Sequence, residues 1–255
     1  MAGLGTSIGW GLLIGASLLA GALLAAVVKL PARVAALLTA FGGGILFAAV
    51  ALELVPEADR EAGVPLTVLG LLAGTLVYVG ADAWLNRNAS MRAMRRAAHA
   101  AAAGQAMAPP DGDEEAARGE SIAVGLFVDG VPESLALGLT IAEGEIGLAL
   151  LAGVVVGNLV ESYGAAQPIA AGGRSGRFAI ALLGGIGVVL ALATIAGATL
   201  LAGASPTFVG IAQAGAAGAV LAVVSISILP HAFEEVSGAA AVATVLGFVV
   251  GYVLS

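Results

Sequence analysis

Eight stretches of mostly apolar residues constrain this chain more than any other feature. A helix needs about 20 apolar residues to cross the hydrocarbon core of a bilayer. Of the 255 residues, 60% are hydrophobic and 11% are charged, which is typical of a polytopic membrane protein. The sequence therefore predicts an all-α fold, a single transmembrane domain over 1–255, with transmembrane helices at 5–28, 33–54, 64–85, 121–142, 146–170, 177–202, 207–230 and 239–254.

The basic residues indicate how this bundle is oriented. Nine of the ten Lys and Arg residues fall in the connections after the first, third and fifth predicted helices, and only Arg60 falls on the other side. Because cytoplasmic loops are enriched in Lys and Arg, we expect these connections in the cytoplasm and both termini outside, in the cell membrane. No positive region precedes the first apolar run, so we expect this run to be retained rather than cleaved as a signal peptide.

The longest connection, 86–120, is expected to be a flexible cytoplasmic loop. Its stretch 91–96 is basic and predicts a helix at the membrane surface, whereas 106–115 is rich in proline, glycine and acid. Basic residues elsewhere are few and scattered, so nucleic acid is not expected as a partner. The absence of cysteine excludes disulfides and thiolate ligands.

Two polar hexads, Asp-Gly-Val-Pro-Glu-Ser and Gly-Asn-Leu-Val-Glu-Ser, interrupt the fourth and fifth apolar runs. A carboxylate at the centre of a bilayer costs about 2.5–3.5 kcal/mol, and neither run contains a Lys or Arg to pair with it. Asp129 and Glu133 are four residues apart, and Asn158 and Glu161 are three apart, so each pair shares one face of its helix. Two such faces turned toward each other would surround a cation with oxygen ligands.

Two alternatives remain open for these residues. Protonated Glu133 and Glu161 could instead hydrogen-bond across the bundle as structural contacts. Pro132 removes the hydrogen bond to the carbonyl of Val128, which either frees an oxygen for the cation or produces a kink that only serves packing.

A weak internal repeat relates the second helix to the seventh. Residues 41–58 combine a glycine-rich start, an apolar run and the ending Leu-Val-Pro-Glu-Ala, and 214–235 follow the same order and end Leu-Pro-His-Ala-Phe-Glu-Glu. The two helices would run in opposite directions, so helices one to three and six to eight would be related by inversion. The prediction is a 3+2+3 inverted-repeat bundle, an arrangement that many secondary transporters use for alternating access.

Together these features resemble the ZIP family of Zrt/Irt-like divalent metal transporters. The resemblance lies in the eight-helix layout, the long loop after helix three, the two hexads and the proline-containing ends of helices two and seven, and it covers essentially the whole chain. It implies a bundle, commonly a homodimer, that moves divalent metal ions toward the cytoplasm and has no prosthetic group. The metal positions would be Asp129, Glu133, Asn158 and Glu161.

The chain departs from the family's pattern in ways that change the expected ligands. Of the pattern His-Asn-x-Pro-Glu-Gly it keeps the Pro-Glu dipeptide, but Asp129 replaces the histidine and Gly130 the asparagine. In the second hexad Glu161 matches, and Gly157 replaces a His or Gln. The remaining donors are all oxygens, which favours Mn²⁺ or Fe²⁺ as the transported ion, with Zn²⁺ still allowed, and argues against a two-metal centre.

Four further residues are candidates for the ends of a transport path. Glu53 and Glu57, near the outer end of the second helix, could gather metal at an entrance. His231 and Glu235, four apart at the inner end of the seventh helix, could form a release site. A solvated helix end is the plain alternative for both pairs.

The function predicted from the sequence is therefore transport of divalent metal across the cell membrane, with metal ions, lipid and a second copy of the chain as partners. The alternative is a ZIP-like membrane protein that does not transport and whose altered site binds metal or regulates. An enzyme is not expected, because no Ser/His or Gly-x-Gly-Asp arrangement lies at membrane depth.

Overall fold

The computed structural model describes residues 2–85, 112–142, 147–171, 175–200 and 203–255. These residues form helices and short connections, without a strand among them. In chain order the helices are α1 (Ala2–Val27), α2 (Ala32–Ala49), the π-helix η1 (Val50–Leu54), α3 (Val55–Ala62), α4 (Val64–Leu85), α6 (Gly112–Ala142), α7 (Leu148–Ala171), α8 (Gly176–Leu200), α9 (Pro206–Val223), the π-helix η2 (Val224–Ile228), α10 (Leu229–Val236) and α11 (Gly238–Leu254).

The predicted character of a helical membrane protein is confirmed. Within the described ranges, six helices are long and apolar enough to cross a membrane: Gly5–Val27, Ala32–Ala62, Val64–Trp84, Leu148–Ala166, Gly176–Leu200 and Pro206–Val236. A seventh apolar helix, Gly238–Leu254, is shorter. The helix α6, which carries Asp129 and Glu133, is not one of the six.

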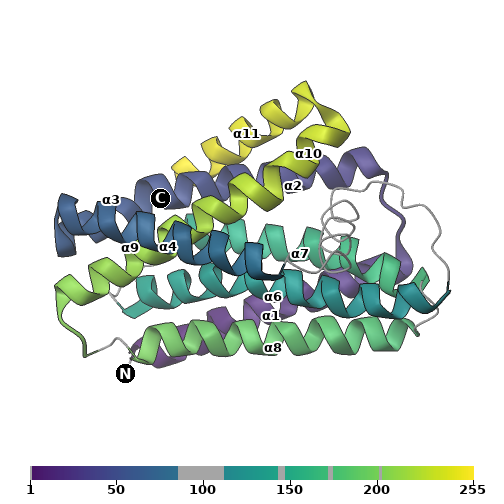
Figure 1. The fold of residues 1–255 in the computed structure, drawn as a ribbon, viewed down its shortest axis with the longest axis horizontal. Coiled ribbons are helices and arrows are strands. Elements are labelled where there is room, and N and C mark those ends of the chain that lie inside the picture. Colours follow the sequence, from purple (N-terminus) through teal and green to yellow (C-terminus); the bar gives the residue numbers. More distant parts are fainter. Residues whose placement is uncertain (1, 86–111, 143–146, 172–174, 201–202) are drawn as a thin grey trace.

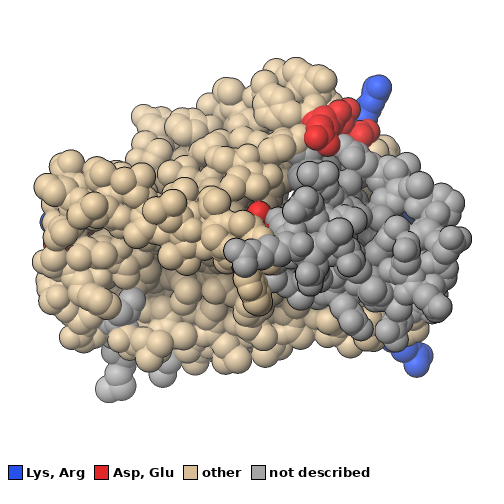
Figure 2. All heavy atoms as spheres, viewed as in Figure 1, with Lys and Arg blue, Asp and Glu red and all other residues tan. Residues whose placement is uncertain are grey.

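The exterior of the described part is largely apolar. Figure 2 shows one face, on which charged side chains are few and gather mainly toward the right-hand end. Large apolar side chains are more than half exposed on several helices, among them Leu12, Leu69, Leu76, Val77, Leu192, Val242 and Val253. Exposed apolar surface on this scale marks contact with lipid or another protein.

Two predicted helix ends are wrong for the same physical reason. We expected the second and seventh helices to end near Leu54 and Pro230, but both continue, to Ala62 and Val236. In each, a π-helical turn comes first and a proline then occupies one of the first positions of the next helix. The helix continues through each proline because the π turn changes the hydrogen-bond pattern just before it: the N–H of Val55 bonds to the carbonyl of Val50, and that of Leu229 to the carbonyl of Val224.

The expected start of the fourth helix is also wrong. The helix α6 begins at Gly112 rather than at 121, so residues 112–120 are helical and not part of a loop. The predicted basic surface helix at 91–96 lies outside the described residues.

The helices pack as a four-helix group and two further helix pairs, which contact each other through α3 with α9 and α10 with α2 (Figure 1). Both α1 and α6 pack against α7 and α8, which makes these four a bundle. The pair α2 and α11 docks through α2 onto α7, and the pair α4 and α9 docks through α9 onto α6. Close approach in both outer pairs requires glycine: a methyl group added at Gly44 would lie 2.0 Å from the carbonyl oxygen of Thr244, and one at Gly74 would lie 1.8 Å from that of Gly215.

The segment α2–η1–α3 is built like the segment α9–η2–α10. Each consists of an 18-residue α-helix, a five-residue π-helix and an eight-residue α-helix with proline near its start. Each ends at a residue with positive φ, Gly63 (78°) and Ser237 (44°). The two segments run in opposite directions through the molecule (Figure 1).

Candidate cation site

The helices that carry the two hexads, α6 and α7, pack against each other. Asp129 and Glu133 lie on α6 and are 2% and 5% exposed, and Asn158 on α7 is 2% exposed. Glu161, also on α7, is half-buried. Three of the four predicted ligands are thus deep in the bundle.

The three carboxylates are close enough for their charges to interact. Glu133 interacts electrostatically with Asp129, and Glu161 interacts with both Glu133 and Asp129. The sequence between 121 and 170 contains no Lys or Arg. Like charges collected at low dielectric repel one another strongly, so this cluster favours a proton or a cation as a partner.

A hydroxyl from α4 contacts the first of these carboxylates. Tyr78, 3% exposed, donates a hydrogen bond of 2.5 Å to Oδ1 of Asp129, and its hydroxyl also lies 3.2 Å from Oγ of Ser227 in η2. The sequence analysis missed both residues. A signal did exist for Tyr78, because a tyrosine in the middle of an apolar span must find a partner for its hydroxyl.

Two buried polar atoms of the hexads, Nδ2 of Asn158 and Oγ of Ser134, lack a hydrogen-bond partner among the described residues, as do atoms of Thr67 and Gln213 elsewhere. An unsatisfied buried polar group costs about 1–3 kcal/mol. Buried polar groups without a partner are rare in native proteins, and each one needs an explanation. Participation in a binding site is one explanation.

The glycines at positions 130 and 157 of the two hexads have different surroundings. A methyl group at Gly130 would lie 2.6 Å from Cδ1 of Leu190 on α8. A methyl group at Gly157 would have no atom within 4 Å. Apolar packing therefore fills the space beside Gly130, whereas the space beside Gly157 is open.

The side chains of the cluster do not form a preorganised metal-coordination site. Across the described ranges, no group of three or more His, Cys, Asp or Glu side chains is arranged to hold a metal ion. Binding of a metal between α6 and α7 therefore requires these side chains to turn toward one point. Pro132 does not break α6, which runs through it from Gly112 to Ala142.

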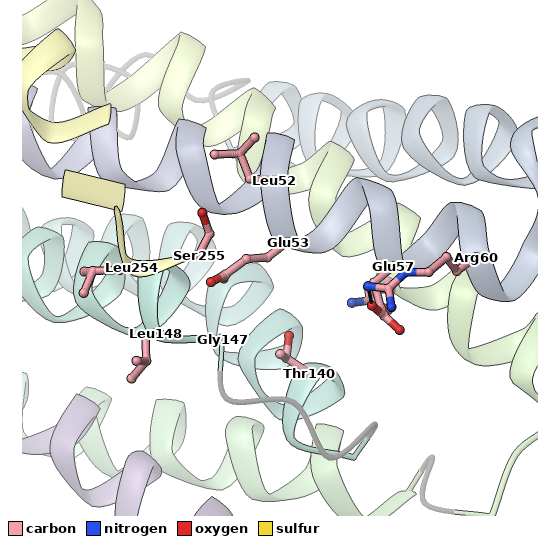
Figure 3. Close-up of a pocket in the computed structure, with 10 residues that line it drawn as sticks. Leu52, Glu53, Glu57, Arg60, Thr140, Gly147, Leu148, Leu254 and Ser255 are labelled. Atoms are coloured by element: carbon pink, nitrogen blue, oxygen red, sulfur yellow. Dashed lines mark hydrogen bonds and ion pairs between the residues drawn. The ribbon is translucent and has the colours of Figure 1, made fainter. Parts of the chain in front are cut away.

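The predicted entrance residues line one pocket of about 230 Å³ between η1, α3 and the facing ends of α6 and α7 (Figure 3). Oε1 and Oε2 of Glu53 accept hydrogen bonds, both of 3.2 Å, from the backbone N–H groups of Ala149 and Leu150. Glu57 forms an ion pair with Arg60 and points away from Glu53. In the structure Glu53 thus caps the start of α7 and Glu57 forms a salt bridge. Their role as a metal entrance stays a prediction.

The predicted release residues lie on α10, one turn apart. Glu235 is half-buried, and the side chain of His231 lies outside what the structure describes. A release site there stays a prediction.

Comparison with known protein families and with curated proteins finds no match to this chain. The class is therefore defined by the fold and the cluster themselves. The chain is a helical membrane protein with a buried group of interacting carboxylates between two of its helices.

Proposed function

We propose that this protein is a transporter that moves divalent metal cations toward the cytoplasm, in the manner of the ZIP family that its sequence resembles. The cation would be held by Asp129, Glu133, Asn158 and Glu161. An all-oxygen set favours Mn²⁺ or Fe²⁺, with Zn²⁺ also allowed.

The observation that carries the proposal is the burial of Asp129 and Glu133 on one face of α6 and of Asn158 on α7, which packs against α6, with no Lys or Arg between 121 and 170. Acidic residues at membrane depth are costly and usually mark an ion or proton pathway. The membrane potential would favour inward movement by about 2.3 kcal/mol per charge per 100 mV.

Two structural features support alternating access in an eight-span, 3+2+3 bundle. The matching, opposed segments α2–η1–α3 and α9–η2–α10 are what an inverted repeat requires. The packing has the same symmetry, since the pair of α2 with α11 corresponds to the pair of α9 with α4. In this proposal α6 and α11 also span the membrane, and α6 and α7 lie between the two repeats.

A second candidate is a ZIP-like membrane protein that binds metal but does not transport it. Two observations favour it: one ligand carboxylate is engaged by Tyr78, and the described acidic residues do not form a ready metal site. Saturable metal binding without flux would distinguish this candidate from a transporter.

The test is uptake into proteoliposomes with Mn²⁺, Fe²⁺, Co²⁺, Zn²⁺ and Cd²⁺. We expect wild type to transport at least one of these ions, and Glu133→Gln and Glu161→Gln, which keep the side-chain shape, to lose most of the uptake. Asp59→Asn removes an exposed acid on α3 and serves as the control, with uptake like wild type. Uptake unchanged in both glutamine variants would refute the site, and absence of flux with retained binding would favour the second candidate.

A further inference from the structure

Tyr78, outside the predicted ligand set, contacts one of the predicted ligands, and Ser227 contacts Tyr78. Tyr78 comes from α4 and Ser227 from η2, and they are 3% and 4% exposed. Neither was expected from the sequence to have a role. The hydroxyl of Tyr78 lies within hydrogen-bond distance of Asp129 on α6 and of Oγ of Ser227.

The hydrogen bonds have a defined direction. An ionised carboxylate can only accept hydrogen bonds, so Tyr78 donates its single hydroxyl hydrogen to Oδ1 of Asp129. The remaining contact of the Tyr78 oxygen, at 3.2 Å, must then be donated by Oγ of Ser227. The result is a chain of two bonds, from Ser227 to Tyr78 to Asp129, that ends on a predicted cation ligand.

We propose that Tyr78, supported by Ser227, is a positioning residue that fixes the Asp129 carboxylate for cation binding. The inference rests on the proposed function. Carboxylates that bind metals are generally held by hydrogen bonds from outside the ligand set, and loss of such a partner typically lowers metal affinity by about 10–100-fold.

The backbone around Ser227 orients its side chain toward Tyr78. Ser227 lies in a π-helical turn, whose extra residue changes the direction of the side chains around it. Its neighbours Ser225 and Ile226 are exposed, whereas Ser227 faces the interior.

A second tyrosine provides the matched control. Tyr163 is also buried, on α7, but its hydroxyl donates to the carbonyl of Val28 (3.1 Å) and accepts from the N–H of Leu30 (2.6 Å). These partners are backbone atoms of the connection between α1 and α2. Removal of this hydroxyl affects a structural contact and leaves the carboxylate cluster alone.

The experiment measures the dissociation constant of Mn²⁺ by calorimetry on the full chain in detergent, with thermal unfolding recorded for every variant. We expect Tyr78→Phe to bind about 10–100-fold more weakly, Ser227→Ala to be weakened less, and the double variant to match Tyr78→Phe, because Ser227 acts through Tyr78. Tyr163→Phe should bind like wild type. In uptake, KM should rise in Tyr78→Phe while the maximum rate stays close to that of wild type.

The outcomes separate this inference from the proposed function. If wild type shows no saturable binding of Mn²⁺, Fe²⁺ or Zn²⁺, both are overturned. If Glu133→Gln abolishes binding but Tyr78→Phe binds like wild type, only the inference is overturned, and equal weakening in Tyr163→Phe has the same meaning. If Tyr78→Phe does not fold, Ser227→Ala decides: affinity equal to wild type would refute the chain of bonds.

Discussion

Glu53 and Ser227 occupy the same place in two matching segments: each is the fourth residue of a five-residue π-helix. Glu53 contacts one of the two central helices directly, and Ser227 is linked to the other through Tyr78. Glu53 accepts two hydrogen bonds from the start of α7, and Ser227 contacts the tyrosine that donates to α6. The π turns are thus the points at which the outer segments are tied to the helices that carry the carboxylates.

The cap that Glu53 gives to α7 should contribute to stability. Glu53→Ala leaves the N–H groups of Ala149 and Leu150 without this acceptor, and loss of a helix cap costs about 0.5–2 kcal/mol. Glu57→Ala removes only an ion pair with Arg60, whose side chain is 66% exposed, and such pairs contribute roughly 0–1 kcal/mol. Thermal unfolding in detergent should therefore rank Glu53→Ala as the less stable variant, and the reverse order would contradict the capping role.

Room at Gly157 makes it possible to return an imidazole to the site. We expect Gly157→His to fold, because an added Cβ meets nothing within 4 Å. Imidazole suits Zn²⁺ better than an all-oxygen site does, so Zn²⁺ affinity relative to Mn²⁺ should rise by about tenfold or more, which is about 1.4 kcal/mol. Gly157→Ala is the control for the backbone change, and competitive metal binding is the measurement. An unchanged Zn²⁺ to Mn²⁺ ratio would place 157 outside the site.

The crossing of α4 and α9 predicts a sharp difference between two glycines of the same helix. Gly74→Ala forces a methyl group against the backbone oxygen of Gly215, and overpacking of this kind typically costs about 1–3 kcal/mol. Gly80→Ala meets no atom within 4 Å and should be neutral or stabilising by up to about 1 kcal/mol. Melting temperatures of the two variants in one detergent check this, and equal values would argue against the close crossing.

The orientation is testable because the chain has no cysteine of its own. Asp59 on α3 and Ser175 before α8 are both exposed, and the predicted topology puts them on opposite sides of the membrane. A membrane-impermeant maleimide should label Asp59→Cys in intact cells and should label Ser175→Cys only after permeabilisation. The opposite result would invert the topology and the predicted direction of transport.

The sequence predicted helix bounds well where glycine or charged residues mark the end of an apolar run. The range 64–85 matches α4, which follows the positive-φ turn at Gly63. The prolines at 56 and 230 misled the prediction, because a proline that starts a new helix after a π turn looks in sequence like one that ends a helix. Nothing in a hydropathy pattern distinguishes the two.

The candidate site was predicted only as far as local spacing allows. Spacing within α6 and α7 placed Asp129 and Glu133 on one face, and the carboxylates of the two helices do interact. The contacts from Tyr78 and Ser227 were not predictable, since they depend on how α4 and η2 pack around α6. The cap provided by Glu53 was missed for the same reason, because its partners are 96 and 97 residues away in the chain.

The two π turns give the molecule a pair of adjustable joints. A π turn holds one residue more than the α-helix around it, and moving that residue along the chain turns the residues that it passes by roughly 100° without unwinding the helix. In this protein the parts beyond the joints are α3, with Glu57, and α10, with His231. Movement of the extra residue from η1 through α3 would therefore rotate the carboxylate of Glu57 about the helix axis while the four central helices stay in place.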